Sequence, residues 1–78
     1  MVIRIELFGH LRKTRLANDF KGGELALPEG STLNDMLSLL QVPLDLPIVI
    51  LVNGQLQPFA QPLNDGDEIQ LLPPVDGG

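Results

Sequence analysis

The 78-residue chain contains no cysteine, and no lysine or arginine occurs after Lys21. The absence of cysteine excludes disulfides, thiolate metal sites and iron–sulfur clusters. No apolar run approaches the roughly 20 residues of a membrane span, and no cleavable signal pattern opens the chain. We therefore expect a cytoplasmic protein with no membrane partner. The length is that of one domain, and 44% hydrophobic residues supply a core.

Charge is unevenly distributed along the chain. All five basic residues lie in the first 21 positions, which carry +3, whereas residues 22–78 carry −8, for a net charge of −5. A chain with this balance is a poor partner for nucleic acid. Charge complementarity favours a basic protein surface as the partner of the second half. Charge alone favours the simpler interpretation, a solvated acidic surface.

Five segments have the pattern of strands, and they cover residues 2–8, 24–27, 48–52, 56–57 and 68–72. Alternation predicts that Ile3, Ile5, Leu7, Leu25, Leu27, Ile69 and Leu71 point inward. The unbroken run at 48–52 is typical of a strand covered, or nearly covered, on both faces. Asn53-Gly54, which follows it, is the strongest hairpin signal in the chain. A short helical turn is expected within residues 10–21.

One helix is predicted after the second strand. Thr32 is the expected N-cap, and Asp35 three residues later completes a capping-box pattern. Leu33, Met36, Leu37 and Leu40 follow at helical spacing and form one apolar stripe. Pro43 stops the helix near Gln41. The order of elements predicts an α+β domain with one main helix on a sheet of four to five strands.

Beyond a domain at 1–72, residues 73–78 (Pro-Pro-Val-Asp-Gly-Gly) are predicted to form an extended tail. Pro73 and Pro74 fix φ and favour an extended exit. Gly77 and Gly78 have no side chains and fit a slot that excludes a Cβ. At about 3.3 Å per residue the tail reaches roughly 20 Å, enough to carry a terminal carboxylate into a partner's active site.

Several stretches together resemble one known family. They are the first strand followed by Leu11-Arg12, "LPEGSTLNDML" at 27–37, "VNG" at 52–54 and "PLNDGDEIQLLPPVDGG" at 62–78. The chain resembles, over essentially its whole length, the ubiquitin-like sulfur carriers of the MoaD/ThiS family. Its Pro-Pro-Val-x-Gly-Gly ending is most similar to the small subunit of molybdopterin synthase. The resemblance implies a β-grasp fold whose first and last strands are adjacent and parallel.

The resemblance also implies the chemistry of the tail. A ubiquitin-activating-like adenylyltransferase uses ATP to adenylate the carboxylate of Gly78, and a persulfide sulfur donor then leaves a thiocarboxylate there. Pro73, Pro74, Val75 and Gly77 carry this group into the large subunit of molybdopterin synthase. Sulfur passes to cyclic pyranopterin monophosphate and builds the dithiolene that holds molybdenum or tungsten. The chain is then a sulfur-donor subunit, not an enzyme, and binds no cofactor or metal.

A docking patch is predicted from strand alternation. Phe8 and Leu72 point away from the inward sets, and Leu56 follows the Asn53-Gly54 turn, so the three apolar side chains are expected to adjoin. In the family, matching positions face the activating enzyme and the large subunit. Asp76 departs from the small or neutral residue usual there, and we expect it to be solvent-exposed. His10, Asp67 and Glu68 are also expected to be solvated.

Three further functions stay open at this point. The same sulfur chemistry serves thiamin, cysteine or tRNA thiolation in other pathways. A ubiquitin-like modifier would join Gly78 to lysines of other proteins. A plain interaction domain would carry an inert tail.

Overall fold

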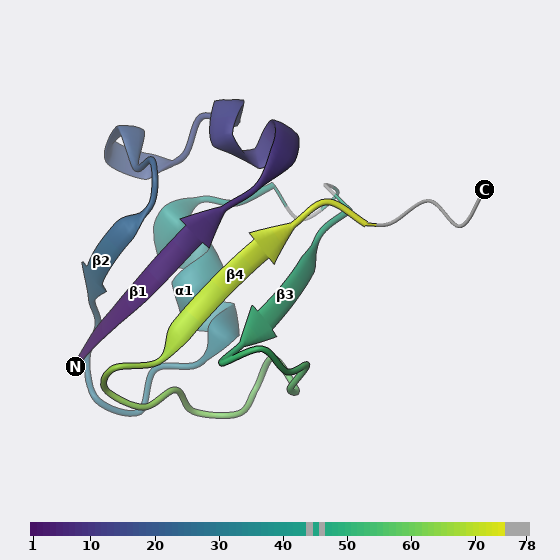
Figure 1. Cartoon of the computed structure of the whole chain (residues 1–78). Helices are drawn as coiled ribbons and strands as arrows, with labels where there is room; N and C mark the ends of the chain where they lie inside the picture. Colours follow the sequence, from purple (N-terminus) through teal and green to yellow (C-terminus); the bar gives the residue numbers. More distant parts are fainter. Residues whose placement is uncertain (44, 46, 75–78) are drawn as a thin grey trace.

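The computed structural model describes residues 1–43, 45 and 47–74 (Figure 1). Within them, four strands form one mixed sheet in the order β2-β1-β4-β3, with one α-helix across one face. The elements in chain order are β1 (Val2–Leu7), the 3-10 helices η1 (Gly9–Lys13) and η2 (Ala17–Asp19), β2 (Gly23–Ala26), α1 (Leu33–Leu40), β3 (Val49–Val52) and β4 (Glu68–Leu72). The predicted α+β architecture and the helical turns after the first strand are confirmed.

The two central strands of the sheet are β1 and β4, and they run parallel. Leu7 lies opposite Leu71 in their register. On its other side β1 pairs antiparallel with β2, and β4 pairs antiparallel with β3, where Val49 lies opposite Leu72. The adjacency of the first and last strands that the family resemblance implied is therefore present, and both strands end at the same edge of the sheet.

Helix α1 begins and ends where its sequence signals predict. The backbone N–H of Asp35 donates to Thr32 Oγ1 at 3.2 Å, and the backbone N–H of Thr32 donates to Asp35 Oδ2 at 3.0 Å, which completes the capping box. Gln41 closes the helix in a left-handed conformation, with φ of +58°. With eight residues, α1 is the longest helix in the described ranges, and none there is suited to cross a bilayer.

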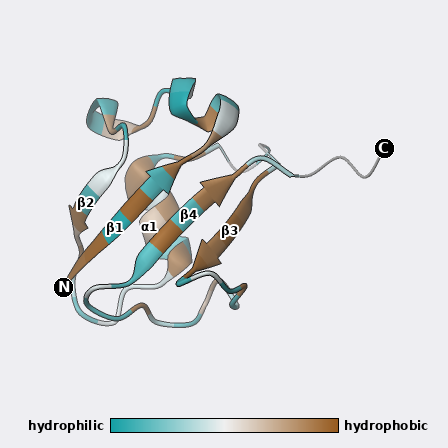
Figure 2. Cartoon of the chain, viewed as in Figure 1, coloured by the Kyte–Doolittle hydropathy of each residue, from teal (hydrophilic) through white to brown (hydrophobic). Residues whose placement is uncertain are grey.

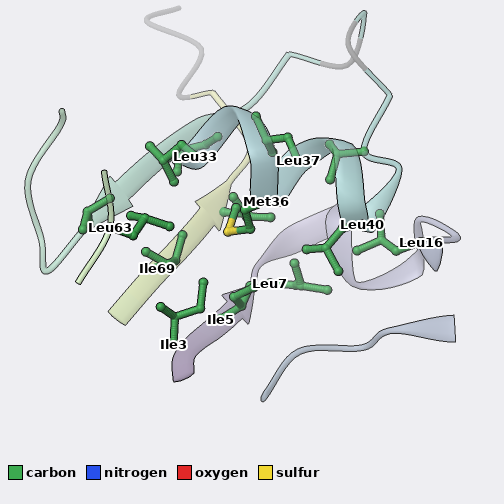
Figure 3. Close-up of a cluster of buried hydrophobic side chains, with 14 of the residues drawn as sticks. Ile3, Ile5, Leu7, Leu16, Leu33, Met36, Leu37, Leu40, Leu63 and Ile69 are labelled. Carbon is green, nitrogen blue, oxygen red and sulfur yellow. The ribbon is translucent and has the colours of Figure 1, made fainter. Parts of the chain in front are cut away.

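The core lies between α1 and the sheet (Figure 3). The helix contributes the predicted stripe of Leu33, Met36, Leu37 and Leu40, and the central strands contribute Ile3, Ile5, Leu7, Ile69 and Leu71; all are buried. Leu63 and Leu16 close the core at its two sides (Figure 3). Truncating such a side chain, for instance Met36→Ala, typically costs about 2–5 kcal/mol.

Three strand predictions need correction. No fifth strand forms at 56–57: Gln55 makes only an isolated bridge with Val52, and Pro58, which lacks an N–H, cannot extend a ladder. β2 ends at Ala26, and Leu25 is only partly buried because β2 is an edge strand. β3 is not covered on both faces, since its alternate residues are only half-buried.

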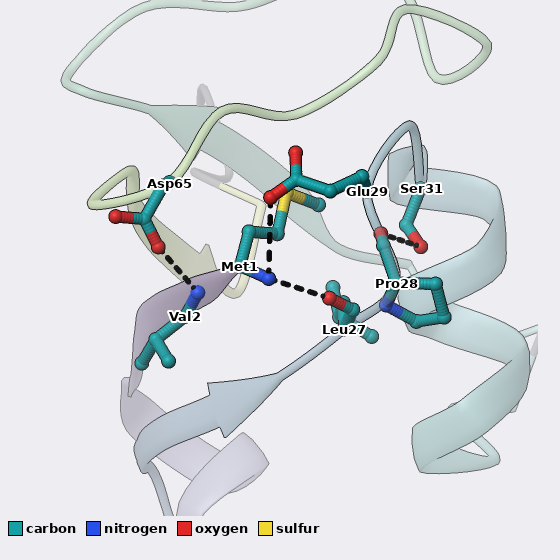
Figure 4. Close-up of polar contacts among 7 residues, drawn as sticks. All are labelled: Met1, Val2, Leu27, Pro28, Glu29, Ser31 and Asp65. Atoms are coloured by element: carbon teal, nitrogen blue, oxygen red, sulfur yellow. Dashed lines mark hydrogen bonds and ion pairs between the residues drawn. The ribbon is translucent and has the colours of Figure 1, made fainter.

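Polar contacts fasten the start of β1 (Figure 4). The N–H of Val2 donates to Asp65 Oδ1 at 2.6 Å. The amino group of Met1 donates to the carbonyl oxygen of Leu27 at 2.9 Å and lies 3.6 Å from Glu29 Oε1. These contacts tie the first strand to the turn before β4 and to the end of β2.

A second polar cluster fixes the start of β4, and it corrects the expectation that Asp67 is solvated. Asp67 is buried, and its carboxylate accepts from Asn53 Nδ2 at 2.9 Å and from the N–H of Asn64 at 2.8 Å. Asn53 adopts φ of +52°, a conformation that asparagine tolerates well, and its Oδ1 accepts from the N–H of Glu68 at 3.0 Å. The cluster therefore locks the β3 turn to β4 and sets where β4 begins.

We predict that Asp67→Ala lowers the free energy of unfolding by about 1–3 kcal/mol, because two donors lose a buried acceptor. Glu68→Ala, at an exposed neighbouring site, is the matched control and changes stability by less than about 0.5 kcal/mol. Urea unfolding measures both. Asn53→Gly keeps the positive φ but removes the side-chain amide. We expect it to lower the free energy of unfolding less in the Asp67→Ala background than in the wild type, because the hydrogen bond between the two side chains is already lost there. Strictly additive costs in that double-mutant cycle would contradict the cluster.

Candidate functional site

The tail leaves the domain directly from β4. Pro73 is half-buried and Pro74 is exposed, so the chain moves from the sheet toward solvent over these two residues. Proline at both positions fixes φ at about −65° and keeps the exit extended. Of the predicted tail residues, Val75, Gly77 and Gly78 lie outside the described residues, as does Asp76.

Pro73 lies against Gly9, the residue that begins η1 after the end of β1. A Cβ built on Gly9 would lie 2.9 Å from Pro73 Cγ and 3.3 Å from Pro73 Cδ, which is closer than such atoms pack. Gly9 also has φ of +60°, a region that favours glycine. The backbone of Gly9 thus forms a seat for the ring of Pro73, the first residue of the tail. No local sequence pattern predicts this contact, because the two residues lie far apart in the chain.

Beside this seat, apolar side chains form a row on the open face of the sheet. The N–H of Phe8 donates to the carbonyl oxygen of Leu71 at 3.0 Å, which extends the β1–β4 register and brings Phe8 beside Leu72. Leu72 lies opposite Val49 of β3. All three are half-buried and point away from α1. We call Phe8, Leu72 and Val49 the apolar row.

The third residue of the predicted patch, Leu56, lies elsewhere. It follows the turn after Val52, which pairs with Ile69 near the start of β4, whereas the apolar row lies where β4 ends. Leu56 is 74% exposed. The structure therefore brings Phe8 and Leu72 together and leaves Leu56 toward the other end of β3.

Sequence reasoning missed the contribution of β3 to this face. Figure 2 shows β3 hydrophobic along its length, whereas β1 alternates between hydrophobic and hydrophilic residues. Val49 and Leu51 are half-buried on the open side, and Ile50 and Val52 are buried beneath. The signal was present in the apolar run at 48–52: an edge strand that is apolar on both faces indicates a partner on its open face.

The described residues form a candidate binding surface, and we find no catalytic cluster among them. Among residues 1–43, 45 and 47–74, no three histidine, aspartate or glutamate side chains gather as a metal site. His10 is exposed, as predicted, and its carbonyl oxygen accepts from Thr14 Oγ1 at 3.2 Å. The buried carboxylate of Asp67 is occupied by the turn that it holds. The end of the domain where β4 finishes therefore presents the tail next to the apolar row.

A mixed four-stranded sheet around one helix, with parallel central strands, defines a ubiquitin-like β-grasp domain. Small archaeal modifier protein 1 of Haloferax volcanii has this fold, with TM-score 0.75, 20% identity, and coverage of 95% of this chain and 98% of that one. A Pyrococcus furiosus protein described as molybdopterin converting factor subunit 1 matches with TM-score 0.73, 20% identity and the same coverage. These two likenesses show the fold alone.

A third structure is more similar in sequence. It is the complex of subunits 1 and 2 of molybdopterin-converting factor from Helicobacter pylori, with 26% identity, TM-score 0.67, and coverage of 100% of both chains. No curated protein matches this chain at a significant level. The sequence profile of the ThiS family matches residues 5–78. The chain belongs to the ThiS family, the ubiquitin-like sulfur carriers that its sequence resembles.

We predict that Gly9→Ala displaces Pro73 and destabilises the domain by more than the about 1–2 kcal/mol expected for a left-handed alanine. Gly66→Ala is the matched control: Gly66 has φ of +85°, and a Cβ there meets nothing within 4 Å. Urea unfolding of both variants separates backbone strain from the clash with Pro73.

The clash is tested by a second substitution. Pro73→Ala should recover part of the stability lost in Gly9→Ala, because the ring atoms nearest the new Cβ are gone, and should recover none in Gly66→Ala. Equal effects of Pro73→Ala in the two backgrounds would mean that Gly9 does not seat the tail.

Proposed function

We propose that this chain is the sulfur-donor subunit of a molybdopterin synthase and carries a thiocarboxylate on Gly78. The observation that carries the proposal is the exit of the tail: β4 runs into Pro73 and exposed Pro74 directly beside the apolar row. Family membership over residues 5–78 supports a sulfur carrier. The Pro-Pro-Val-x-Gly-Gly ending favours the molybdopterin pathway within the family.

The chemistry requires a partner at every step. A carboxylate oxygen of Gly78 attacks the α-phosphorus of ATP, and pyrophosphate leaves. The terminal sulfur of a persulfide then attacks the acyl carbon, and AMP leaves. A thiol of the sulfur-donating partner cleaves the resulting acyl disulfide, which oxidises that thiol to a disulfide and leaves the thiocarboxylate. The chain itself contributes the thin tail and the surface that aims it.

Delivery uses the same exit. The thiocarboxylate sulfur attacks a carbon of the pyranopterin precursor within the large subunit and displaces an oxygen substituent from that carbon. Hydrolysis of the acyl–sulfur bond then leaves the sulfur on the precursor and returns a carboxylate to Gly78. Two such deliveries supply the two sulfurs of the dithiolene. The chain holds no cofactor of its own in this scheme, and ATP is consumed by the activating adenylyltransferase.

The apolar row is the proposed docking surface for both partners, with Leu56 as an outlying contact. The Helicobacter pylori structure, at 26% identity, is a complex of subunits 1 and 2 and supports a large-subunit partner. The row contains hydrophobic side chains from β3, from β4 and from Phe8, which directly follows β1; such a composition is expected at the centre of an interface. A partner seated there would lie next to Pro73, at the root of the tail.

We predict that intact-mass measurement of the chain from its own cells finds a fraction in which one sulfur replaces one oxygen. Removing Gly77 and Gly78 should abolish this fraction, because no carboxylate then reaches the adenylylating site. Unfolding of the truncated chain should match that of the full chain, since the missing residues follow the last strand and both tail prolines.

Three outcomes discriminate among functions. Loss of molybdenum or tungsten enzyme activity on deletion supports the molybdopterin pathway, whereas a requirement for thiamin or cysteine, or unthiolated tRNA, assigns the sulfur elsewhere. Gly-Gly remnants on lysines of other proteins would assign a protein modifier. A chain that never gains sulfur, with a phenotype unchanged by removing Gly77 and Gly78, would overturn the proposal.

A further inference from the structure

A hollow of about 380 Å³ lies next to the apolar row, between the open face of β1 and the segment that leads into β2. Three basic side chains from three parts of the chain line it: Arg4 of β1, Arg12 of η1 and Lys21. Phe8, which belongs to the apolar row, lines the same hollow, and so does Glu6. We call this the basic hollow.

Among the described residues, its basic side chains make no ion pairs. In the part of the chain that the structure describes, no carboxylate lies within ion-pair distance of Arg4, Arg12 or Lys21. Arg4 faces Glu24 and Glu68 in the strand register, and Glu6 lines the hollow, so these carboxylates offset the charge of Arg4. The positive charge offered to a partner is therefore that of Arg12 and Lys21.

The side chain of Arg12 is anchored at one point. Its Nε donates to the carbonyl oxygen of Leu7 at 3.3 Å, which anchors the guanidinium at the end of β1. Its two terminal nitrogens have no partner among the described contacts, and such a pair binds a carboxylate in two parallel hydrogen bonds. Lys21, which is exposed, adds an ammonium from the segment that leads into β2.

We propose that the basic hollow binds carboxylate side chains of the large subunit when that subunit docks on the apolar row. Two observations carry this assignment: three of the five basic residues line one hollow whose only lining acid, among the described residues, is Glu6, on a chain of net charge −5, and the hollow is continuous with the row through Phe8. An acidic partner segment complements the hollow, whereas the acidic remainder of the chain repels it and so fixes the orientation of docking. The assignment rests on the proposed function, because it takes the large subunit as the partner.

The experiment compares two charge-reversed double variants that alter the net charge equally. Arg12→Glu with Lys21→Glu changes the hollow, and Lys13→Glu with Arg15→Glu changes basic residues that do not line it. Affinity for the large subunit of the same organism is measured by calorimetry. We expect the hollow variant to bind about tenfold more weakly at about 0.1 M salt, and the control to change about twofold or less.

Salt dependence gives a second readout. Raising salt from about 0.1 M to about 1 M shortens the screening length from about 10 Å to about 3 Å, so the difference between wild type and hollow variant should narrow. Lys21→Glu alone is included because Lys21 makes no hydrogen bond among the described contacts, and urea unfolding checks that Arg12→Glu leaves a folded domain.

Two results would overturn the assignment: equal weakening by the hollow and control variants, or no binding of the large subunit by wild type. Neither result bears on sulfur loading, which intact mass reports separately. If the wild-type chain gains sulfur but the hollow variant binds the large subunit as well as the control does, the proposed function stands and the role of the basic hollow is refuted.

Discussion

The parallel pairing of β1 with β4 is the constraint on which the rest of this structure depends. Parallel neighbours cannot be joined by a tight turn, so the chain between them has to travel around the domain. Here that path supplies an antiparallel strand at each edge of the sheet and the helix that covers one face. Because the two strands run in the same direction, the end of the first and the end of the last meet, and Gly9 comes to lie under Pro73.

The two ends of β4 are stabilised in different ways, and the difference suits a domain that presents a tail. Where β4 begins, hydrogen bonds dominate: Asp67 holds Asn53 and Asn64, and nearby Asp65 holds the start of β1. Where it finishes, the contacts are apolar and half-exposed, through Phe8, Val49 and Leu72. The hydrogen bonds at the start of β4 fix the register of the strand. Hydrophobic surface can therefore stay open to a partner at the end of β4 while the position from which the tail leaves remains defined.

Local chemistry made much of the fold readable in advance. The capping box of Thr32 and Asp35, the helical stripe behind it and the alternation in the first and last strands each depend on residues a few positions apart, and each is confirmed. The burial of Asp67 was missed because its partner Asn53 belongs to another turn. The seat of Pro73 on Gly9 was hidden for the same reason, since contacts between distant residues leave no local pattern.

The site residues were likewise predicted correctly where local patterns apply and incorrectly where they do not. Phe8 and Leu72 were brought together correctly because strand alternation and the implied pairing of the first and last strands both apply to them. Leu56 was assigned a strand that Pro58 prevents, and Val49 was overlooked because an apolar run conceals which of its residues face outward. For the final residues of the tail, composition remains the guide, since they lie beyond the described residues.

The outer edge of β3 carries a risk for the chain when it is alone. Val49–Val52 is short, carries no charge and ends the sheet. Gln55 pairs with Val52 at this edge, so the backbone before Val52 is the part on which another copy can pair edge to edge. Repulsion between copies of net charge −5 opposes such pairing, and it fades as pH falls toward the isoelectric point near 4.4. The acidic composition therefore keeps copies of the unaccompanied chain apart at neutral pH.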